Sequence, residues 1–263
     1  MKFSVLLPTR NRLNLLKHAV NTVLKQDYDN WEIIISDNFS EEDIKTYVME
    51  LGDYRIKYYK TNNFIPVTEN WNNALKLSSG DYFIMLGDDD CLMKGYFSNM
   101  KNFIEKFNNP EVIYSSAYLF AYPNVIPNKP KGYLHEFSKG KIFKSHKNPF
   151  FLDKKTSNYL VKSSLNFKIK FDYNMQFSLI KKDLVKKLNK FGEFFQSPYP
   201  DYYASNVILL QSNSTLVVPS PMVTIGISPK SFGFYYFNNK EIEGNKFLKN
   251  IADPFIRKKL KNI

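Results

Sequence analysis

The sequence lacks the features of disulfide-stabilised proteins and of membrane-spanning proteins. It holds a single cysteine, Cys91, among 263 residues, so a disulfide framework is excluded and a reducing compartment is expected. No apolar run approaches the ~20 residues that span a bilayer, and the apolar stretch that ends at Pro8 is too short for the core of a signal peptide. We therefore expect a cytoplasmic protein, soluble or at most peripheral on the inner face of the membrane.

Acidic residues are outnumbered by basic ones. There are 37 Lys and Arg against 25 Asp and Glu, a formal net charge of +12. Such an excess favours an anionic partner, which would be nucleotide phosphates, nucleic acid or an acidic membrane surface, although a genomic bias toward Lys, Asn, Ile and Phe would produce it as well. Because the lysines are spread along the chain and form no basic stripe interleaved with aromatics, we expect no nucleic-acid partner.

Apolar and aromatic residues are abundant. They make up 43% of the chain, with 23 Phe and 18 Tyr, which is enough for a substantial core and argues against global disorder. Apolar strand-like and helical periodicities alternate through the first 100 residues, which predicts an α/β fold with a mostly parallel, doubly wound sheet. The expected strands are residues 3–8, 32–36, 55–59 (an edge strand, with Arg55 and Lys57), 82–86, 112–116, 175–180 and 215–218, and the expected helices are 13–26, 41–51, 69–78, 95–107, 182–189 and 201–211.

The regular pattern breaks in two places. Residues 122–172 are rich in Pro, Lys, Asn and Ser, and we expect a long loop or subdomain there. The tail from Lys240 is predicted to be a basic helix. Its residues 257–261 are similar to a weak peripheral membrane anchor, with a plain solvated helix as the alternative.

Polar clusters follow three of the expected strands, at residues 9–12, 37–40 and 87–90. Ligands of parallel sheets bind at the carboxyl ends of the strands, so one site is expected to gather all three clusters. The third cluster contains the adjacent carboxylates of Asp88, Asp89 and Asp90, which repel one another unless a cation neutralises them. Oxygen ligands favour Mg²⁺ or Mn²⁺, held by one or two carboxylates and substrate phosphates. A solvated acidic turn is the alternative.

The other two clusters offer contacts for a nucleotide. Asp37 could accept hydrogen bonds from a base or a ribose, and Arg10 could bind a phosphate with two parallel hydrogen bonds. An Asx-turn or a helix cap is the alternative for Asp37, and a surface position is the alternative for Arg10.

Taken together, these segments resemble a family 2 glycosyltransferase with the GT-A fold. The order and spacing match the opening strand of that family, its first-helix Gln, its "DDGS" turn, its mid-domain Asn and its DXD motif. The match covers the first 95 residues well and the remainder poorly. The matching segments are residues 4–12, Leu15, Gln26, 32–40, 70–72 and 80–90.

The resemblance implies a fold and an order of functions along the chain. The fold would be a Rossmann-like, mostly parallel central sheet flanked by helices, with an irregular acceptor-side elaboration and a C-terminal helix. Residues 1–120 would bind the nucleotide-sugar donor and residues 121–174 would form the variable acceptor side. Residues 175–239 would hold the catalytic base, and residues 240–263 would be the basic helix.

The resemblance also implies roles for the donor-side residues. Pro8, Thr9, Arg10 and Asp37 would line the nucleoside pocket, with Asp37 facing the base, and Asn70 would join the nucleotide-binding set.

The acidic motif has an open register. Asp88 and Asp90 would contact the ribose and a Mn²⁺ or Mg²⁺ ion, and Asp89 is a further donor-binding residue. Two departures blur which carboxylate does what, since many members carry Asp where this chain has Gly87, and Asp is common where it has Asn38.

An inverting transfer needs a carboxylate that deprotonates the acceptor hydroxyl. In the family this residue lies at the start of a helix after the central region, which matches Asp201, with Glu193 as the alternative and an ordinary helix cap as the structural explanation. A C-terminal His commonly completes the diphosphate site, but all three histidines here precede residue 150. Lys230 or the serines of the segment 226–233 would substitute, unless this is a surface loop.

The implied function is metal-dependent inverting transfer of a sugar from a nucleotide-diphosphate donor. UDP is the expected nucleotide. The acceptor would be a saccharide or a lipid-linked saccharide in bacterial surface-polysaccharide synthesis of the capsule or lipopolysaccharide type. A sugar nucleotidyltransferase is an alternative, but residues 8–12 lack the glycine-rich loop of that class. A catalytically inactive nucleotide-sugar-binding domain is the other.

Overall fold

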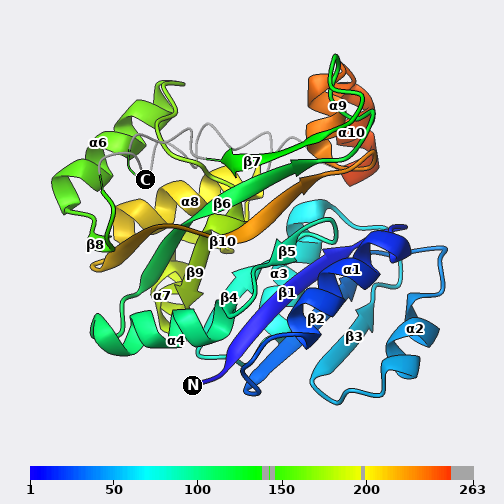
Figure 1. Ribbon diagram of the computed structural model, residues 1–263, viewed down its shortest axis with the longest axis horizontal. Coiled ribbons are helices and arrows are strands. Elements are labelled where there is room, and N and C mark those ends of the chain that lie inside the picture. The colour runs from blue at the N-terminus through cyan, green and yellow to red at the C-terminus, as the bar shows by residue number, and fades with distance from the viewer. Residues whose placement is uncertain (138–141, 143–145, 197–198, 250–263) are drawn as a thin grey trace.

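The molecule is built around one twisted sheet with helices on both faces (Figure 1). The computed structural model describes residues 1–137, 142, 146–196 and 199–249. The strands are β1 (Phe3–Thr9), β2 (Trp31–Asp37), β3 (Ile56–Lys60), β4 (Tyr82–Met85), β5 (Cys91–Leu92), β6 (Val112–Ala121), β7 (Tyr133–Phe137), β8 (Phe150–Phe151), β9 (Ser178–Lys181) and β10 (Thr215–Ile227). The helices are α1 (Leu13–Leu24), α2 (Ile44–Leu51), α3 (Val67–Leu77), α4 (Tyr96–Lys106), α6 (Lys154–Leu165), α7 (Lys182–Leu188), α8 (Pro200–Gln211), α9 (Phe232–Phe237) and α10 (Glu241–Leu248), with short 3-10 turns η1 (Met175–Phe177) and η2 (Asn189–Phe191).

The strand order is β3-β2-β1-β4-β9-β6-β10-β5, with β7 paired to β6 and β8 paired to β10. Strands β3, β2, β1 and β4 run parallel, as do β6 and β10, while β9 is inserted antiparallel between β4 and β6. The α/β class and the edge position of β3 are therefore confirmed.

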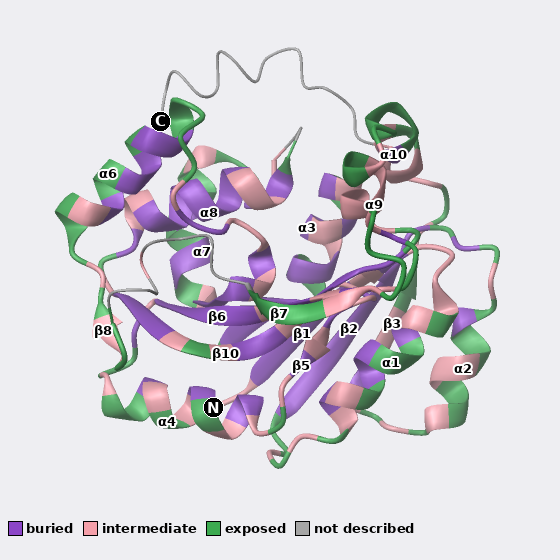
Figure 2. Cartoon of the chain, turned by 45° about the horizontal axis from the view of Figure 1, so that its top comes forward, coloured by how far each residue is buried: buried purple, intermediate pink, exposed green. Residues whose placement is uncertain are grey.

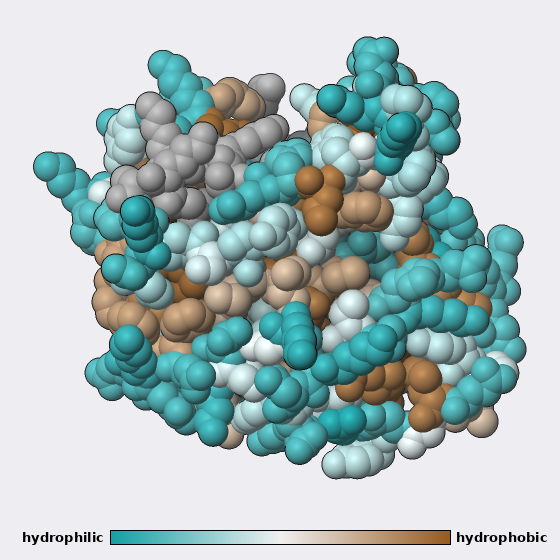
Figure 3. All heavy atoms as spheres, viewed as in Figure 1, coloured by the Kyte–Doolittle hydropathy of each residue, from teal (hydrophilic) through white to brown (hydrophobic). Residues whose placement is uncertain are grey.

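Alternating side chains of the central strands enter two separate cores, one on each face of the sheet. Leu7 packs in the core under α1, α2 and α4, whereas its neighbour Leu6 packs under α3, α7 and α8. Burial of each such leucine contributes roughly 1.5–3 kcal/mol. Figure 2 shows the result, with buried strands in the middle and exposed residues on the outer helices. On the face drawn in Figure 3, hydrophobic residues form separate small patches within a mainly hydrophilic surface.

The segment predicted to be irregular contains regular structure. It forms β7, β8 and the helix α6, of 12 residues. The buried positions of α6 include only two apolar residues, Leu160 and Val161, beside Ser157, Ser163 and Ser164. Small polar residues in the buried stripe hide the apolar periodicity from which the sequence analysis predicts helices.

Two further boundaries differ from the prediction. Strand β10 was expected to end at Val218 but continues to Ile227, past Pro219 and Pro221. Its pairing with β6 shifts register on both sides of Pro221, as expected of bulges that accommodate proline in a sheet. The segment predicted as a strand over residues 175–180 begins as the 3-10 turn η1. Only its later part, in β9, pairs with other strands of the sheet.

The sheet topology brings the three polar clusters to one edge. Thr9 pairs with Asp37 at the ends of β1 and β2, and the N–H of Leu86, just after β4, donates to the carbonyl of Leu6 at 2.9 Å. Within the described part of the chain, no helix is both long and apolar enough to cross a membrane. The basic residues 257–261 lie outside the described residues.

Candidate active site

The acidic turn after β4 is anchored to the loop after β1. Asp88 is buried; its Oδ2 accepts a hydrogen bond from Thr9 Oγ1 and its Oδ1 one from an Arg12 guanidinium nitrogen, both at 2.7 Å. Burial raises the pKa of Asp88, although Arg12 opposes the shift. Desolvation would lower the pKa of Arg12, but Asp88 and Asp89 outweigh it and leave that pKa raised. The pair therefore joins a buried carboxylate to a permanently charged cation.

Asp90 faces the other side of the turn. Its Oδ1 accepts from the Gly226 N–H at 2.8 Å, and its Oδ2 accepts from the Gly87 N–H at 2.7 Å and from Gln176 Nε2 at 2.5 Å. Burial, followed by the charge of Asp89, raises the pKa of Asp90 to about 7. A Cβ at Gly87 would lie 2.5 Å from Asp90 Oδ2, so the glycine leaves room for the Asp90 carboxylate.

Asp89 lies beneath the end of β10. Ser228 Oγ donates to its Oδ2 at 2.7 Å, and the nearest Arg12 nitrogen is 4.0 Å from its Oδ1. A Cβ at Gly226 would lie 2.0 Å from the Asp89 carbonyl oxygen. The strand passes so close to the acidic turn that only glycine fits at this position.

The chemistry of this cluster fits a hard divalent cation. Three adjacent carboxylates face one close guanidinium. Burial is the main cause of the raised pKa values of Asp88 and Asp90, and the neighbouring charge of Asp89 adds to both. No group of three or more His, Cys, Asp or Glu side chains could hold a metal ion within the described residues. Mg²⁺ is usually held in proteins by one or two carboxylates together with substrate phosphates, and the acidic turn offers carboxylates of that kind.

The ends of β2 and β3 form the neighbouring part of the site. Buried Asp37 accepts a hydrogen bond from the Tyr58 hydroxyl at 2.7 Å and from the Ser40 N–H at 2.9 Å. Burial and Asp37 together raise the pKa of Tyr58, so the phenol stays protonated as a donor. Asn70 exchanges two hydrogen bonds with Ser36, at 2.7 and 3.1 Å. Its amide thus fixes the residue before Asp37.

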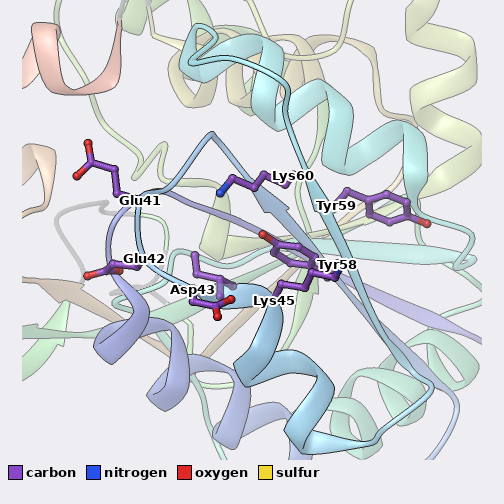
Figure 4. A pocket seen from close by; sticks show the side chains of 8 residues that line it. Glu41, Glu42, Asp43, Lys45, Tyr58, Tyr59 and Lys60 are labelled. Carbon is purple, nitrogen blue, oxygen red and sulfur yellow. The ribbon is translucent and has the colours of Figure 1, made fainter.

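A hollow of about 700 Å³ adjoins Asp37 through Tyr58 (Figure 4). Lys60, on its wall, donates to the Ser40 carbonyl at 2.6 Å. The hollow does not reach the carboxylates of residues 88–90. Its lining is Glu41, Glu42, Asp43, Ile44, Lys45, Tyr58, Tyr59 and Lys60.

Aromatic residues cover the loop after β1. The Arg10 guanidinium lies 3.9 Å from the ring centre of Phe64 and 5.9 Å from that of Phe247, and the Arg12 guanidinium lies 5.1 Å from the Phe247 ring. The Nε atoms of both arginines are buried without a hydrogen-bond partner. Phe247 belongs to α10, so this helix packs directly on the predicted donor site.

Lys230 also reaches this loop. Its Nζ donates to the Asn11 carbonyl at 2.6 Å, and its own carbonyl accepts from Arg12. The segment 226–230 therefore packs against the acidic turn and the loop after β1. Its predicted role, to take the place of a histidine at the diphosphate, stays a prediction.

Asp201 lies at the start of α8, directly after Pro200. The residue is partly exposed, but its carboxyl, which accepts from the Tyr202 N–H at 2.8 Å, is desolvated, and this raises its pKa to about 6. The alternative base, Glu193, is an exposed residue paired with Lys76 at 3.1 Å. The raised pKa is compatible with the role predicted for Asp201, and that role stays a prediction.

The predicted donor-side residues come together at one edge of the sheet, although their roles remain predictions. Pro8 lies on β1, where it pairs with Ser36, and the next residue, Thr9, contacts the acidic turn through Asp88. Sequence reasoning missed the contacts of Gln176 and Tyr58. Neither residue belongs to a polar cluster after a predicted strand, so no local pattern marked them.

The fold and this edge define a GT-A glycosyltransferase. Residues 4–171 match the family described as "Glycosyl transferase family 2". The chain belongs to that family. The structure resembles the crystal structure of S. aureus TarS 1-349 with a TM-score of 0.66 at 18% identity, over 94% of this chain and 69% of that one. It also resembles the same protein in complex with UDP-GlcNAc, with a TM-score of 0.64 at 16% identity, over 94% and 70%.

Two curated relatives are similar in sequence. The GalNAc(5)-diNAcBac-PP-undecaprenol beta-1,3-glucosyltransferase of Campylobacter jejuni is 35% identical over 140 residues, which is 52% of this chain and 42% of that protein. The UDP-Glc:alpha-D-GlcNAc-diphosphoundecaprenol beta-1,3-glucosyltransferase WfgD of Escherichia coli is 28% identical over 122 residues, 42% of this chain and 48% of that protein. The matches therefore span less than half the length of either relative.

Proposed function

We propose that this chain transfers a sugar from a nucleotide-diphosphate donor, UDP-linked in the first instance, to a saccharide on a lipid carrier in bacterial surface-polysaccharide synthesis. The observation that supports this most directly is the acidic turn of Asp88–Asp90, closed between the loop after β1 and the end of β10. A carboxylate with a raised pKa, Asp201, stands at the start of α8. Membership of the family favours this reaction over sugar nucleotidyl transfer.

Within this proposal the three carboxylates divide their work. The family resemblance implies a metal contact for Asp88 and Asp90. In the structure, however, both carboxylate oxygens of each residue already accept hydrogen bonds from the protein. Asp89 keeps Oδ1 least committed, with Arg12 at 4.0 Å. We therefore assign the cation contact first to Asp89, with Asp88 and Asp90 holding the turn in place. A bound Mn²⁺ or Mg²⁺ would offset the negative charge that develops on the leaving diphosphate.

Arg12, Arg10 and Lys230 would provide the protein's own positive charge near that diphosphate. Arg12 is fixed by Asp88 and by the Lys230 carbonyl, so its position is set before the donor arrives. Preorganised cations of this kind stabilise developing charge without reorganisation during the reaction. Asp37 and Tyr58 would receive the nucleoside at the neighbouring strand ends.

Asp201 would act as the general base. An acceptor hydroxyl would lose its proton to the Asp201 carboxylate while its oxygen bonds to the anomeric carbon, and the bond from that carbon to the diphosphate oxygen would break. Attack opposite the leaving group inverts the anomeric configuration. With a pKa of about 6, Asp201 is mostly ionised near neutral pH and can accept the proton.

The lipid-linked acceptor and the UDP donor are suggested by the relatives. Two are named for undecaprenol-linked acceptors, and one similar structure contains UDP-GlcNAc. A cytoplasmic location, peripheral to the inner face of the membrane, would give the chain access to both substrates.

Thermal-shift measurements with UDP, GDP, dTDP and CMP, each with Mn²⁺ and with EDTA, test the donor half of the proposal. A ligand that binds only the folded state raises the melting temperature. Stabilisation by one nucleotide only when metal is present would support the proposal and identify the donor class. If no nucleotide stabilises the chain, the proposed donor site is wrong for the isolated chain, and the inactive-domain alternative gains support.

A further inference from the structure

The end of α6 and the turn after it carry large apolar side chains that are exposed. Phe167 is 94% exposed, Leu165 is 48% exposed and Ile169 is 47% exposed. Tyr159, which lies earlier in α6, is 53% exposed. Such residues rarely gather on a free surface without a partner, and the helix lies at the end of the molecule away from α1 and α2 (Figure 1).

Lysines surround these apolar residues, and acids are absent. Residues 154–170 contain five lysines and no Asp or Glu. Lys155, Lys162 and Lys168 are exposed, while the Lys170 ammonium lies 4.4 Å from the Tyr159 ring centre. Aromatic and aliphatic side chains flanked by lysine stems are typical of surfaces that enter the headgroup region of a bilayer.

The backbone holds Phe167 outward at a conformational cost. Phe167 has a φ of 58°, and its N–H donates to the Ser164 carbonyl at 2.9 Å while that of Lys168 donates to the Ser163 carbonyl at 2.9 Å. This is the Schellman ending of a helix, in which the left-handed position is usually glycine. An exposed phenylalanine there gains nothing from packing, which points to a role outside the folded chain.

Hydrogen bonds join the end of α6, which carries the exposed apolar residues, to the residue after the proposed catalytic base. The Tyr202 hydroxyl donates to the Ser164 carbonyl at 2.9 Å, and Ser164 Oγ donates to the Tyr202 oxygen at 3.1 Å. Tyr202 follows Asp201 in α8, and Ser164 precedes the exposed Leu165. A surface bound through the turn after α6 would therefore lie beside the start of α8, where the acceptor hydroxyl must arrive.

We infer that residues 155–170 form a docking surface for an anionic lipid bilayer, which brings a lipid-linked acceptor to Asp201. The apolar side chains would enter the headgroup region and the lysines would attract anionic lipids. The inference rests on the proposed function only for the nature of the acceptor. Binding to lipid itself can be measured without any sugar transfer.

Sedimentation with vesicles of phosphatidylcholine, with and without phosphatidylglycerol, tests the inference. We expect binding only to the anionic vesicles. Phe167→Asn should weaken it roughly tenfold, because the aromatic ring that would enter the headgroup region is lost. Asparagine tolerates the left-handed backbone, so the fold should be kept. The matched control is Tyr54→Asn, which removes an aromatic residue that is 90% exposed at the far end of the sheet and should leave binding unchanged.

A second pair of variants tests the charges. Replacing Lys155, Lys162 and Lys168 by glutamine should weaken binding by about 5-fold per lysine. The same triple change at Lys17, Lys25 and Lys45, exposed lysines on and beside α1 and α2, has an equal effect on net charge. Equal losses in the two triple variants would show attraction by net charge alone and would overturn the assignment to this patch.

Two other results would also overturn the inference. One is vesicle binding by Phe167→Asn as tight as that of the unchanged chain. The other is a dimer in light scattering that Phe167→Asn converts to a monomer, which would make a second copy the occupant. Thermal shifts with UDP and Mn²⁺ on the same variants keep the proposals separate, because loss of nucleotide binding counts against the donor site and not against the lipid surface.

Discussion

The backbone N–H of Gly226 donates a hydrogen bond of 2.8 Å to Asp90 Oδ1. The contact joins the end of β10 to the turn after β4, across 136 positions of sequence. It brings Ser228 to Asp89 and Lys230 to the loop after β1. The predicted donor site is thus bordered by a strand that has room only for glycine at the point of closest approach.

Gly226→Ala should damage this arrangement. The new Cβ would meet the Asp89 carbonyl oxygen at 2.0 Å, and since that atom is backbone, the strand or the turn must move. We expect a loss of roughly 1–3 kcal/mol in the free energy of unfolding by urea, together with weaker UDP binding. Gly233→Ala, whose Cβ would meet the flexible Ile227 side chain at 3.3 Å, is the control. Equal stability of the two variants would contradict the close approach.

Asp201→Asn should abolish sugar transfer and leave donor binding intact. The amide has nearly the same shape but cannot take the proton from the acceptor, a contribution on the order of 10²–10⁴-fold in rate. Initial rates and UDP-induced thermal shifts measure the two effects separately. Glu193→Gln, which alters an exposed ion pair, should keep its rate. Full activity in Asp201→Asn would place the base elsewhere.

Transfer should depend on pH through the same carboxyl. Because burial raises the pKa of Asp201 to about 6, the reactive carboxylate is lost as the pH falls through that value. With saturating donor and metal, kcat should be nearly constant above about pH 7 and drop about tenfold per pH unit below about pH 6. A flat profile across that region would show that no group of this pKa limits the reaction.

Asp89→Asn should remove the effect of metal on nucleotide binding. The neutral amide keeps the hydrogen bond from Ser228 as an acceptor but loses the charge that would attract a cation. We expect Mn²⁺ to stabilise the UDP complex of the unchanged chain and to have little effect on the variant. Asp81→Asn, at the other end of β4, where the carboxylate accepts from the Lys2 N–H, should respond to Mn²⁺ like the unchanged chain. A normal response of Asp89→Asn would return the cation to Asp88 or Asp90.

Glu32 should make stability depend on acid. Its buried carboxylate pairs with Lys2 and Lys57, both at 2.7 Å. Desolvation opposes ionisation, but these partners lower the pKa of Glu32 from 4.5 to about 2. At pH values above the unfolded-state pKa of about 4.5, the depressed pKa contributes about 3 kcal/mol to the free energy of unfolding. This contribution is lost as the pH falls from about 4.5 toward 2.

Urea unfolding across that acid range, on the unchanged chain and on Glu32→Gln, measures this contribution. The variant should be less stable near neutral pH and should lose less stability on acidification. Glu105→Gln, which removes an exposed pair with Lys101 at 3.7 Å, should change stability by less than about 1 kcal/mol. Parallel acid curves for Glu32→Gln and the unchanged chain would assign the acid sensitivity to other groups.

Much of the donor half could be predicted from the chain alone. The apolar stretches that became β1, β2 and β4 each end in a polar cluster, and parallel strands place such ends at one edge whatever the details of packing. Arg12 was part of one cluster, but its partner Asp88 is 76 positions away. The pairing of a particular cation with a particular carboxylate depends on how β1 and β4 lie side by side.

The later part of the chain was harder to predict for physical reasons. In α6, Ser157, Ser163 and Ser164 occupy buried positions, so the stripe has no apolar period. In β10, Pro219 lies where a strand would ordinarily end, and bulges carry the pairing past it. Both elements are stabilised by what packs against them more than by their own residue preferences.

The sequence by itself determined the alternation of strands and helices, the gathering of three polar clusters at the carboxyl ends of the strands, and the presence of a carboxylate at the start of α8. These follow from local periodicity and from the direction of the chain. Only the tertiary structure decided that Gln176 and Gly226 hold Asp90, and that Asp89 keeps the least committed oxygen. Those contacts join elements distant in sequence, and their geometry is set by strand order and packing, which no local pattern encodes.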